Sequence, residues 1–166
     1  MISPSGLRAE QRGRASQNAE ERGMADAAYA VFSAPLWARA FFDLIATRTS
    51  IHYFLQKSFV GEVDPGLEEY AYQTSHQPGA EYVPLYFLSG KLFTRDVRRR
   101  VYEKLMTPTM IVFDEDPFVG FERLDDLLRE NPHVQAVRIT PTRGLPQFEN
   151  LEHTVQALEG FWKRHF

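Results

Sequence analysis

The apolar positions divide the chain into three stretches with different periods. Residues 1–23 contain no aromatic and few apolar side chains, too few to offset the entropy of ordering, so we expect a loop or disordered segment there. Residues 24–105 repeat apolar side chains at helical intervals, and residues 106–166 combine short apolar runs with helical stripes. The pattern predicts an N-terminal loop, a helical region and a C-terminal α/β part.

The first half of the helical region carries three apolar stripes. Pro35 suits the first turn of a helix that ends near Ile45, because its missing N–H has no intrahelical partner at that position. A second stripe begins at Ile51. Asp64 precedes Pro65 and can cap a third helix by accepting a hydrogen bond from a first-turn N–H.

Two more segments complete the helical region. Residues 81–92 are rich in Tyr and Phe and favour a helix, although a strand over Tyr82–Leu88 is the alternative. Thr94 can cap a last helix through Leu105. Its expected inward residues are Val97, Val101 and Leu105. The basic run Arg98–Arg100 then lies on a solvated helix surface, an interpretation that we favour over a phosphate site.

From residue 106 onward the pattern changes to that of an α/β protein. Met110–Phe113 is a continuous apolar run, as expected of a strand buried on both faces, and Val134–Ile139 forms a second one. A helix between them ends before Asn131, and another follows Asn150. The residues of that last helix expected to face inward are Val155, Leu158, Phe161 and Trp162. The order strand, helix, strand, helix predicts an α/β fold with a parallel sheet.

Two strands make an incomplete parallel sheet. Parallel strands belong in sheets that are covered on both faces, and a sheet of only two strands leaves unpaired edges. Either Tyr82–Leu88 joins the sheet, or its other strands lie on another polypeptide segment.

Composition narrows the classes of partner. With 166 residues the chain is long enough for one domain, and its net charge of -3, from 22 acidic and 19 basic residues, argues against nucleic acid. It contains no cysteine, no apolar run of the roughly 20 residues that span a bilayer, and no secretory signal pattern. We therefore expect a cytoplasmic protein without a membrane span, a cofactor or a metal site.

An acidic turn follows the first strand, in Asp114-Glu115-Asp116-Pro117. A carboxylate at the carboxyl end of a strand can orient and stabilise an imidazolium. An Asp-Pro pair is equally common as an ordinary turn, in which the Asp side chain bonds nearby backbone N–H groups. Cation binding by the three carboxylates is a weaker alternative, because their spacing differs from that of a calcium loop.

The segment from Pro35 to Phe166 resembles the lid helices and the last two strands of an α/β-hydrolase. The resemblance implies that Asp116 is the acid of a catalytic triad, with Asp114 as the second choice. The family's histidine loop corresponds to Arg143-Gly-Leu-Pro-Gln-Phe-Glu149, where Gly144 occupies the histidine position.

Other parts of the triad have no counterpart in this chain. The Gly-x-Ser-x-Gly elbow that presents the nucleophile is absent from the sequence. Met1–Leu7 resembles the end of the strand that follows the nucleophile helix. His133 and His153 are the nearest candidates for a replacement base, but neither lies in the expected loop.

Two functions follow from this resemblance. The first is the C-terminal part of a serine ester or amide hydrolase, catalytically incompetent as this chain because the nucleophile and the histidine are missing. The alternative is a non-catalytic binding or interaction protein that keeps a hydrolase-like remnant and uses its aromatic helices to hold an apolar, lipid-like ligand or a protein partner. In either case the aromatic helical region could hold a small apolar, ester-like ligand, and exposed sheet edges predict self-association.

Overall fold

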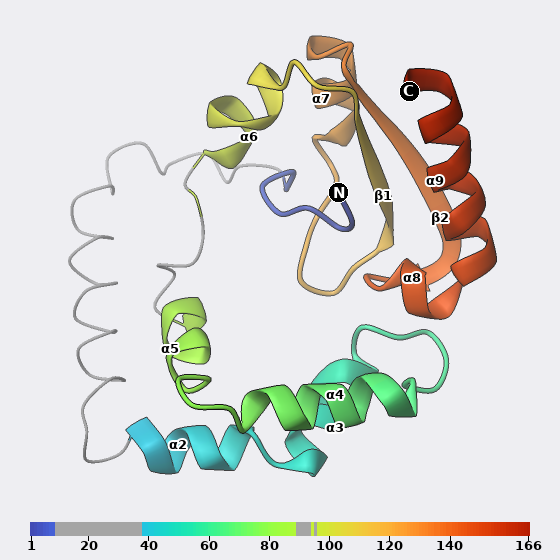
Figure 1. Cartoon of the computed structure of the whole chain (residues 1–166). Coiled ribbons are helices and arrows are strands. Elements are labelled where there is room, and N and C mark those ends of the chain that lie inside the picture. Colours follow the sequence, from blue (N-terminus) through green and yellow to red (C-terminus); the bar gives the residue numbers. More distant parts are fainter. Residues whose placement is uncertain (9–37, 89–93, 95) are drawn as a thin grey trace. The chain divides into compact units, whose positions relative to one another are not determined.

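The computed structural model describes residues 1–8, 38–88, 94 and 96–166 (Figure 1). It contains helices and a two-stranded parallel sheet, which confirms the predicted α/β class. The chain forms two compact units. The sheet unit comprises Met1–Glu10, Leu55–Glu62 and Asp96–Phe166, and the helical unit comprises Gln11–Phe54 and Val63–Arg95. These units divide the chain differently from the predicted segments, since residues 55–62 and 96–105 belong with the sheet.

The sheet pairs β1 (Thr109–Glu115) in parallel with β2 (Val134–Arg143), and α7 (Leu124–Glu130) connects them. Alternate residues of β1 point to opposite faces and are buried on both, as the continuous apolar run predicts. The pairing is regular from Thr109 with Val134 to Phe113 with Arg138. It then shifts, so that Glu115 pairs with Arg143 and β2 carries an irregular insertion near its end.

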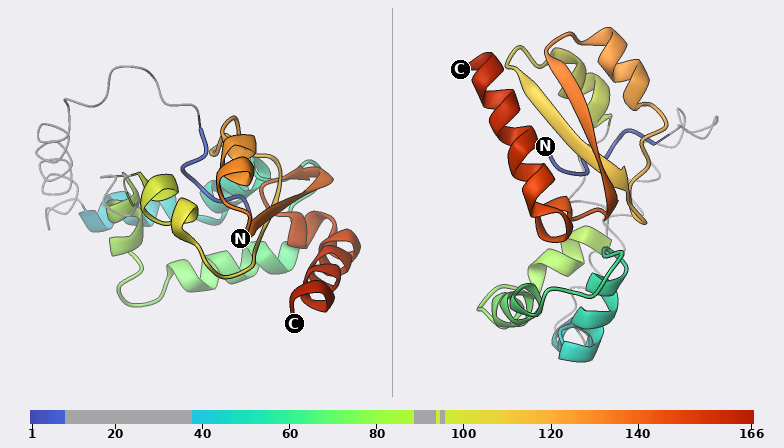
Figure 2. Two further views of the ribbon diagram at one scale, coloured as in Figure 1. Left: turned by 90° about the horizontal axis from the view of Figure 1, so that it is seen from above. Right: turned by 90° about the vertical axis from the view of Figure 1, so that its right-hand side faces the viewer.

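Helices cover both faces of this sheet (Figure 2). One face packs against α9 (Leu151–His165), and the other packs against α7 and the short elements α6 (Val97–Arg100) and η2 (Tyr102–Lys104). The core on the α9 face consists of Met110, Val112, Ile139 and Phe161. The core on the α7 face consists of Leu7, Tyr102, Ile111, Leu124, Leu127 and Val134.

The first residues of the chain extend the sheet along the free edge of β1. Ile2 forms a parallel bridge with Val112, and the N–H of Ser3 donates to the Val112 carbonyl at 3.0 Å. Leu7 is fully buried, and its carbonyl accepts from the N–H of Arg123 at 2.9 Å. Residues 1–3 therefore run parallel to β1 at its free edge. Most of the loop predicted over residues 1–23 lies outside the described residues.

The helical unit follows the predicted apolar stripes. Among its described residues, the helices are α2 (Ala38–Ile45), α3 (Arg48–Gln56, whose last two residues fall in the sheet unit), α4 (Pro65–Ser75) and α5 (Tyr82–Leu88). The Asp64 side chain caps α4 by accepting from the Leu67 N–H at 2.7 Å, as predicted. The alternative that Tyr82–Leu88 joins the sheet is wrong, because this segment is α5.

The helix predicted from Thr94 to Leu105 is wrong in its length. The chain instead forms one turn of α-helix, α6, and then the 3₁₀ turn η2. This tightening rotates the following side chains, so that Tyr102 is buried and Val101 is 41% exposed. Tyr102 therefore takes the core position that periodicity gives to Val101.

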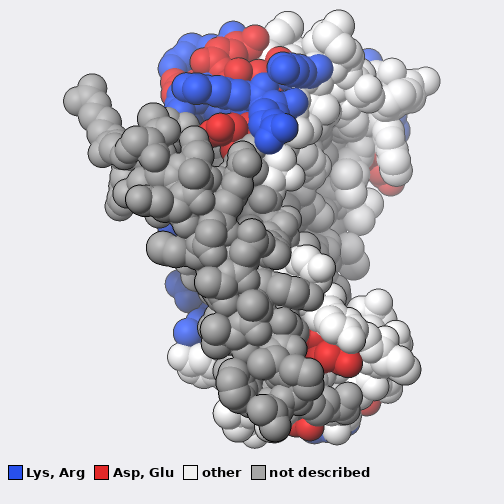
Figure 3. Space-filling view, turned by 90° about the vertical axis from the view of Figure 1, so that its left-hand side faces the viewer, with Lys and Arg blue, Asp and Glu red and all other residues white. Residues whose placement is uncertain are grey.

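The basic run on α6 is only partly a solvated surface. Arg99 and Arg100 are exposed, but Arg98 is buried, bonds Glu130 and lies 3.3 Å from Glu103. Figure 3 shows Lys and Arg gathered beside Asp and Glu over the part of the sheet unit that carries α6. The prediction fails at Arg98 because ion pairs with acidic residues distant in sequence offset the burial of its charge.

The last helix differs from its predicted packing. Of the four residues expected to face inward, Phe161 is buried, whereas Val155, Leu158 and Trp162 are exposed. Across the described residues, no helix is both long enough and apolar enough to cross a bilayer.

Candidate functional site

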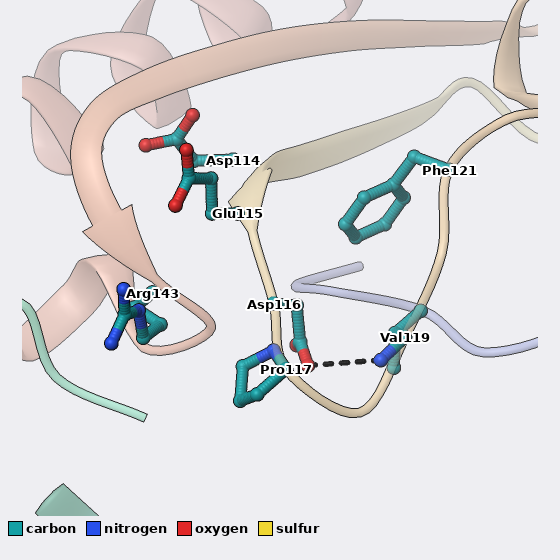
Figure 4. Close-up of a pocket in the computed structure, with 7 residues that line it drawn as sticks. All are labelled: Asp114, Glu115, Asp116, Pro117, Val119, Phe121 and Arg143. Carbon is teal, nitrogen blue, oxygen red and sulfur yellow. Dashed lines mark hydrogen bonds between the residues drawn. The ribbon is translucent and has the colours of Figure 1, made fainter. Parts of the chain in front are cut away.

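The acidic turn lies at the carboxyl end of β1, beside the loop that leaves β2. A pocket of about 430 Å³ opens there (Figure 4). Its lining residues are Asp114, Glu115, Asp116, Pro117, Val119, Phe121 and Arg143. Parallel strands place their carboxyl ends at one edge of the sheet, so two loops far apart in sequence meet at this pocket.

Asp116 forms the ordinary turn that its sequence context predicts. Its Oδ1 accepts from the N–H groups of Phe118 at 2.7 Å and Val119 at 3.0 Å, which is the ordinary Asx turn. Its Oδ2 faces Gly144 in the loop after β2. One oxygen thus holds the turn, while the other faces the position that the resemblance assigns to a histidine.

Gly144 is in direct proximity to the Asp116 carboxylate. A Cβ placed on Gly144 would lie 3.0 Å from Asp116 Oδ2 and 3.4 Å from Cγ. The φ of Gly144 is 101°, a backbone conformation that L side chains rarely adopt. The loop therefore favours glycine at this position, and the acid occupies the space next to its Cα.

Asp114, the second choice for the acid, is a structural carboxylate. Its side chain is 3% exposed, and it accepts from Arg138 Nε at 2.7 Å and from the Thr142 N–H at 2.8 Å. Burial raises the pKa of the Asp114 carboxyl, but the Thr142 N–H and the Arg138 guanidinium outweigh burial and hold that pKa below its usual value. Asp114 fixes the irregular end of β2 and keeps no free oxygen for chemistry.

Glu149 is a site residue to which the sequence prediction gave no role. Its Oε2 accepts from the Arg143 N–H and its Oε1 from the Val60 N–H, both at 2.6 Å. It thereby ties the loop after β2 to residues 55–62 within the sheet unit. The only sequence signal is its place as the last residue of the histidine-loop motif. In that motif the buried Oε1 of Gln147 accepts no hydrogen bond from the described residues.

The two candidate replacement histidines lie away from this pocket. His133 directly precedes β2, whereas the acid turn follows β1. Because the two strands are parallel, His133 and the acid turn lie at opposite ends of the strands. His153 lies in the first turn of α9, and its Nδ1 is 2.7 Å from Asn150 Oδ1. Neither histidine lines the pocket, so the structure brings no imidazole to Asp116 among the described residues.

The described residues bear on the alternative that the acidic turn binds a cation. They contain no group of three or more His, Cys, Asp or Glu side chains arranged to hold a metal ion. Although Asp114, Glu115 and Asp116 are consecutive, the oxygens of Asp114 are engaged by Arg138 and Thr142, and Asp116 Oδ1 is engaged by its own turn.

Comparison with known proteins gives one structural neighbour of low similarity. No family model matches the sequence, and no curated protein matches it. Among solved structures, the chain is similar to a membrane phospholipase A described as a novel bacterial virulence factor, with a TM-score of 0.49 and 16% identity. The match covers 72% of this chain and 39% of the phospholipase chain. The α/β-hydrolase resemblance therefore stays a prediction.

Proposed function

We propose that this chain is the acid-bearing, C-terminal part of an α/β-hydrolase-like protein and that it does not complete acyl transfer by itself. The supporting observation is the 3.0 Å between Asp116 Oδ2 and a Cβ at Gly144. The acid turn and the loop after β2 lie side by side, which supports a pairing of the acid and histidine positions. The histidine position, however, carries a glycine, which cannot accept a proton.

The nature of the missing groups explains why the remaining site is inactive. Acyl transfer by a serine hydrolase needs a nucleophile, a base that takes its proton, and an acid that orients the base. Asp116 supplies only the acid. Without an imidazole next to it, the Asp116 carboxylate cannot take the proton of a distant serine hydroxyl. There is also no imidazolium for Asp116 to stabilise.

An esterase assay tests this incompetence. We expect the purified chain to release p-nitrophenol from short-chain p-nitrophenyl esters at the rate of the buffer blank, and Asp116→Asn to give the same rate. We also expect no labelling by a fluorophosphonate probe, which reacts with activated serines, under conditions in which a known serine hydrolase is labelled. Turnover above the blank that Asp116→Asn abolishes would show that the chain is an enzyme.

The hydrolase-like geometry has an independent test, in which an imidazole is returned to the loop. In Gly144→His, the introduced ring should titrate with a higher pKa than in the double variant Gly144→His/Asp116→Asn, by about one unit or more for a carboxylate within 4–6 Å. Proton NMR measures both values, with His133 as the internal control that should not respond to Asp116. Equal pKa values in the two variants, both with native amide spectra, would contradict the proposed pairing of acid and histidine positions.

The alternative is a binding protein with a hydrolase-like remnant, and the exposed aromatic side chains of the helical unit favour it. These include Tyr53, Phe54, Tyr82, Tyr86 and Phe87. The esterase assay separates the two functions when it is combined with equilibrium binding. A p-nitrophenyl ester that binds tightly and stoichiometrically but is never hydrolysed would favour the binding role.

A further inference from the structure

One side of α9 carries an apolar stripe that the described part of the chain leaves uncovered. The residues are Leu151, Val155, Leu158 and Trp162, which are 62%, 41%, 39% and 60% exposed. Their spacing of four, three and four residues places them in one line along the helix. A different side of α9, with Thr154 and Phe161, packs on the sheet. The stripe is therefore additional to the core contact, and contiguous exposed apolar surface of this kind marks interaction sites.

The stripe has the spacing of a two-helix seam. Apolar residues that alternate at intervals of three and four form the buried seam when two helices pack side by side at a small angle. A helix of 15 residues is about 22 Å long, enough for the four side chains to interlock with a similar helix. The complementary surface for such a stripe is another amphipathic helix.

Charges beside the stripe identify a second copy of α9 as that helix, in antiparallel orientation. Along the helix, the acidic Glu152 and Glu159 come first and Lys163 comes last. An antiparallel copy brings Leu151 opposite Trp162 and Val155 opposite Leu158, so that Glu152 of each copy lies beside Lys163 of the other. A parallel copy would place Glu152 beside Glu152 and Lys163 beside Lys163, which is unfavourable.

From this stripe and its charges, we propose that the chain forms a two-fold symmetric dimer through antiparallel pairing of α9. A two-fold axis generates this arrangement from one self-complementary surface. One pair of helices buries less than the roughly 800 Å² per partner of a standard interface. The dimer is therefore weak, forms in the micromolar range or above, and exchanges rapidly.

Sedimentation velocity of the full chain, from low micromolar to several hundred micromolar, tests the dimer. We expect the sedimentation coefficient to rise with concentration, and Trp162→Glu to weaken association at least tenfold. Leu151→Glu should do the same, and it retains the fold because a carboxylate is favourable in the first turn of a helix. The matched control is Met106→Glu, which changes an exposed apolar residue of the same unit outside α9.

Cross-linking tests the antiparallel orientation of the two α9 helices. The chain has no cysteine of its own, so single introduced cysteines react alone. Glu152→Cys and Lys163→Cys chains are treated with a short bismaleimide, separately and mixed. Antiparallel pairing predicts cross-linked dimers mainly in the mixture, whereas parallel pairing predicts them in each variant alone. A chain that is monomeric at every concentration, a dimer that survives both stripe substitutions, or the parallel pattern overturns the proposal.

Discussion

Asp114→Asn is expected to lower the free energy of unfolding of the sheet unit by about 2–3 kcal/mol at neutral pH, because hydrogen bonds to a buried charged group are worth more than neutral ones. Both carboxylate oxygens accept, one from Arg138 and the other from Thr142. An asparagine amide has one acceptor, so its NH₂ group would face either the guanidinium or the buried Thr142 N–H. One donor is then left unsatisfied at the irregular end of β2.

The loss should depend on pH in a definite direction. The pKa of Asp114 in the folded protein is below its usual value, which is close to 3.9 in an unfolded chain. A depressed pKa means that the stabilisation by Asp114 is fully present above the unfolded pKa and is lost as the pH falls through the folded one. The difference in unfolding free energy between wild type and Asp114→Asn should therefore be constant at neutral pH and shrink below about pH 4.

Urea denaturation measured by circular dichroism over this pH range gives the free energies, and hydrogen exchange of the β1 amides reports the sheet unit alone. Glu115→Gln is the matched control, because Glu115 is the exposed neighbour of Asp114 on the same strand. It should change stability by less than about 0.5 kcal/mol. If both substitutions had the same small effect, Asp114 would not stabilise the end of β2 as its two hydrogen bonds indicate.

Sequence patterns predict those parts of the fold that depend on local periodicity. The run from Met110 to Phe113 predicts a strand buried on both faces, and β1 is such a strand. Asp64 predicts the cap of α4 because a cap requires only neighbouring residues. These features are determined over a few residues, so their physical cause is visible in the sequence.

Features that depend on distant residues could not be predicted in this way. Periodicity cannot show that Arg98 pairs with Glu130, 32 residues away in sequence, or that η2 turns Tyr102 inward in place of Val101. Periodicity also predicts that Val155, Leu158 and Trp162 pack inward, and this is wrong because periodicity identifies an apolar face but not what covers it.

The candidate site likewise combines features that the sequence predicts with features that it does not. The sequence locates Asp116 and Gly144 in loops after successive strands, and parallel pairing of those strands brings them together. The sequence does not show that Asp114 accepts a hydrogen bond from the insertion near the end of β2, because that irregularity is known only from the strand register. Glu149 was missed for a similar reason, since one of its two partners, Val60, is far away in sequence.

Gly144→Ala is expected to destabilise the sheet unit by about 1–3 kcal/mol, the usual cost of a non-glycine residue in a sparsely populated backbone region. At φ 101° the added methyl group strains the loop, and it also meets Asp116 Oδ2 at 3.0 Å. Thermal and urea unfolding measure the loss. Gly61→Ala is the control, since a Cβ there meets nothing within 4 Å, and it should be neutral or slightly stabilising.

A double-mutant cycle separates the two causes of this loss. Asp116→Ala removes the carboxylate that the new methyl group approaches, so Gly144→Ala should cost less in that background than in the wild type, by the energy of the contact. The part that remains is the backbone strain at φ 101°. An equal cost in both backgrounds would place the whole effect in the backbone. It would also show that the Asp116 carboxylate moves away freely, and so is not held against Gly144 as the proposed relation between acid and histidine loop requires.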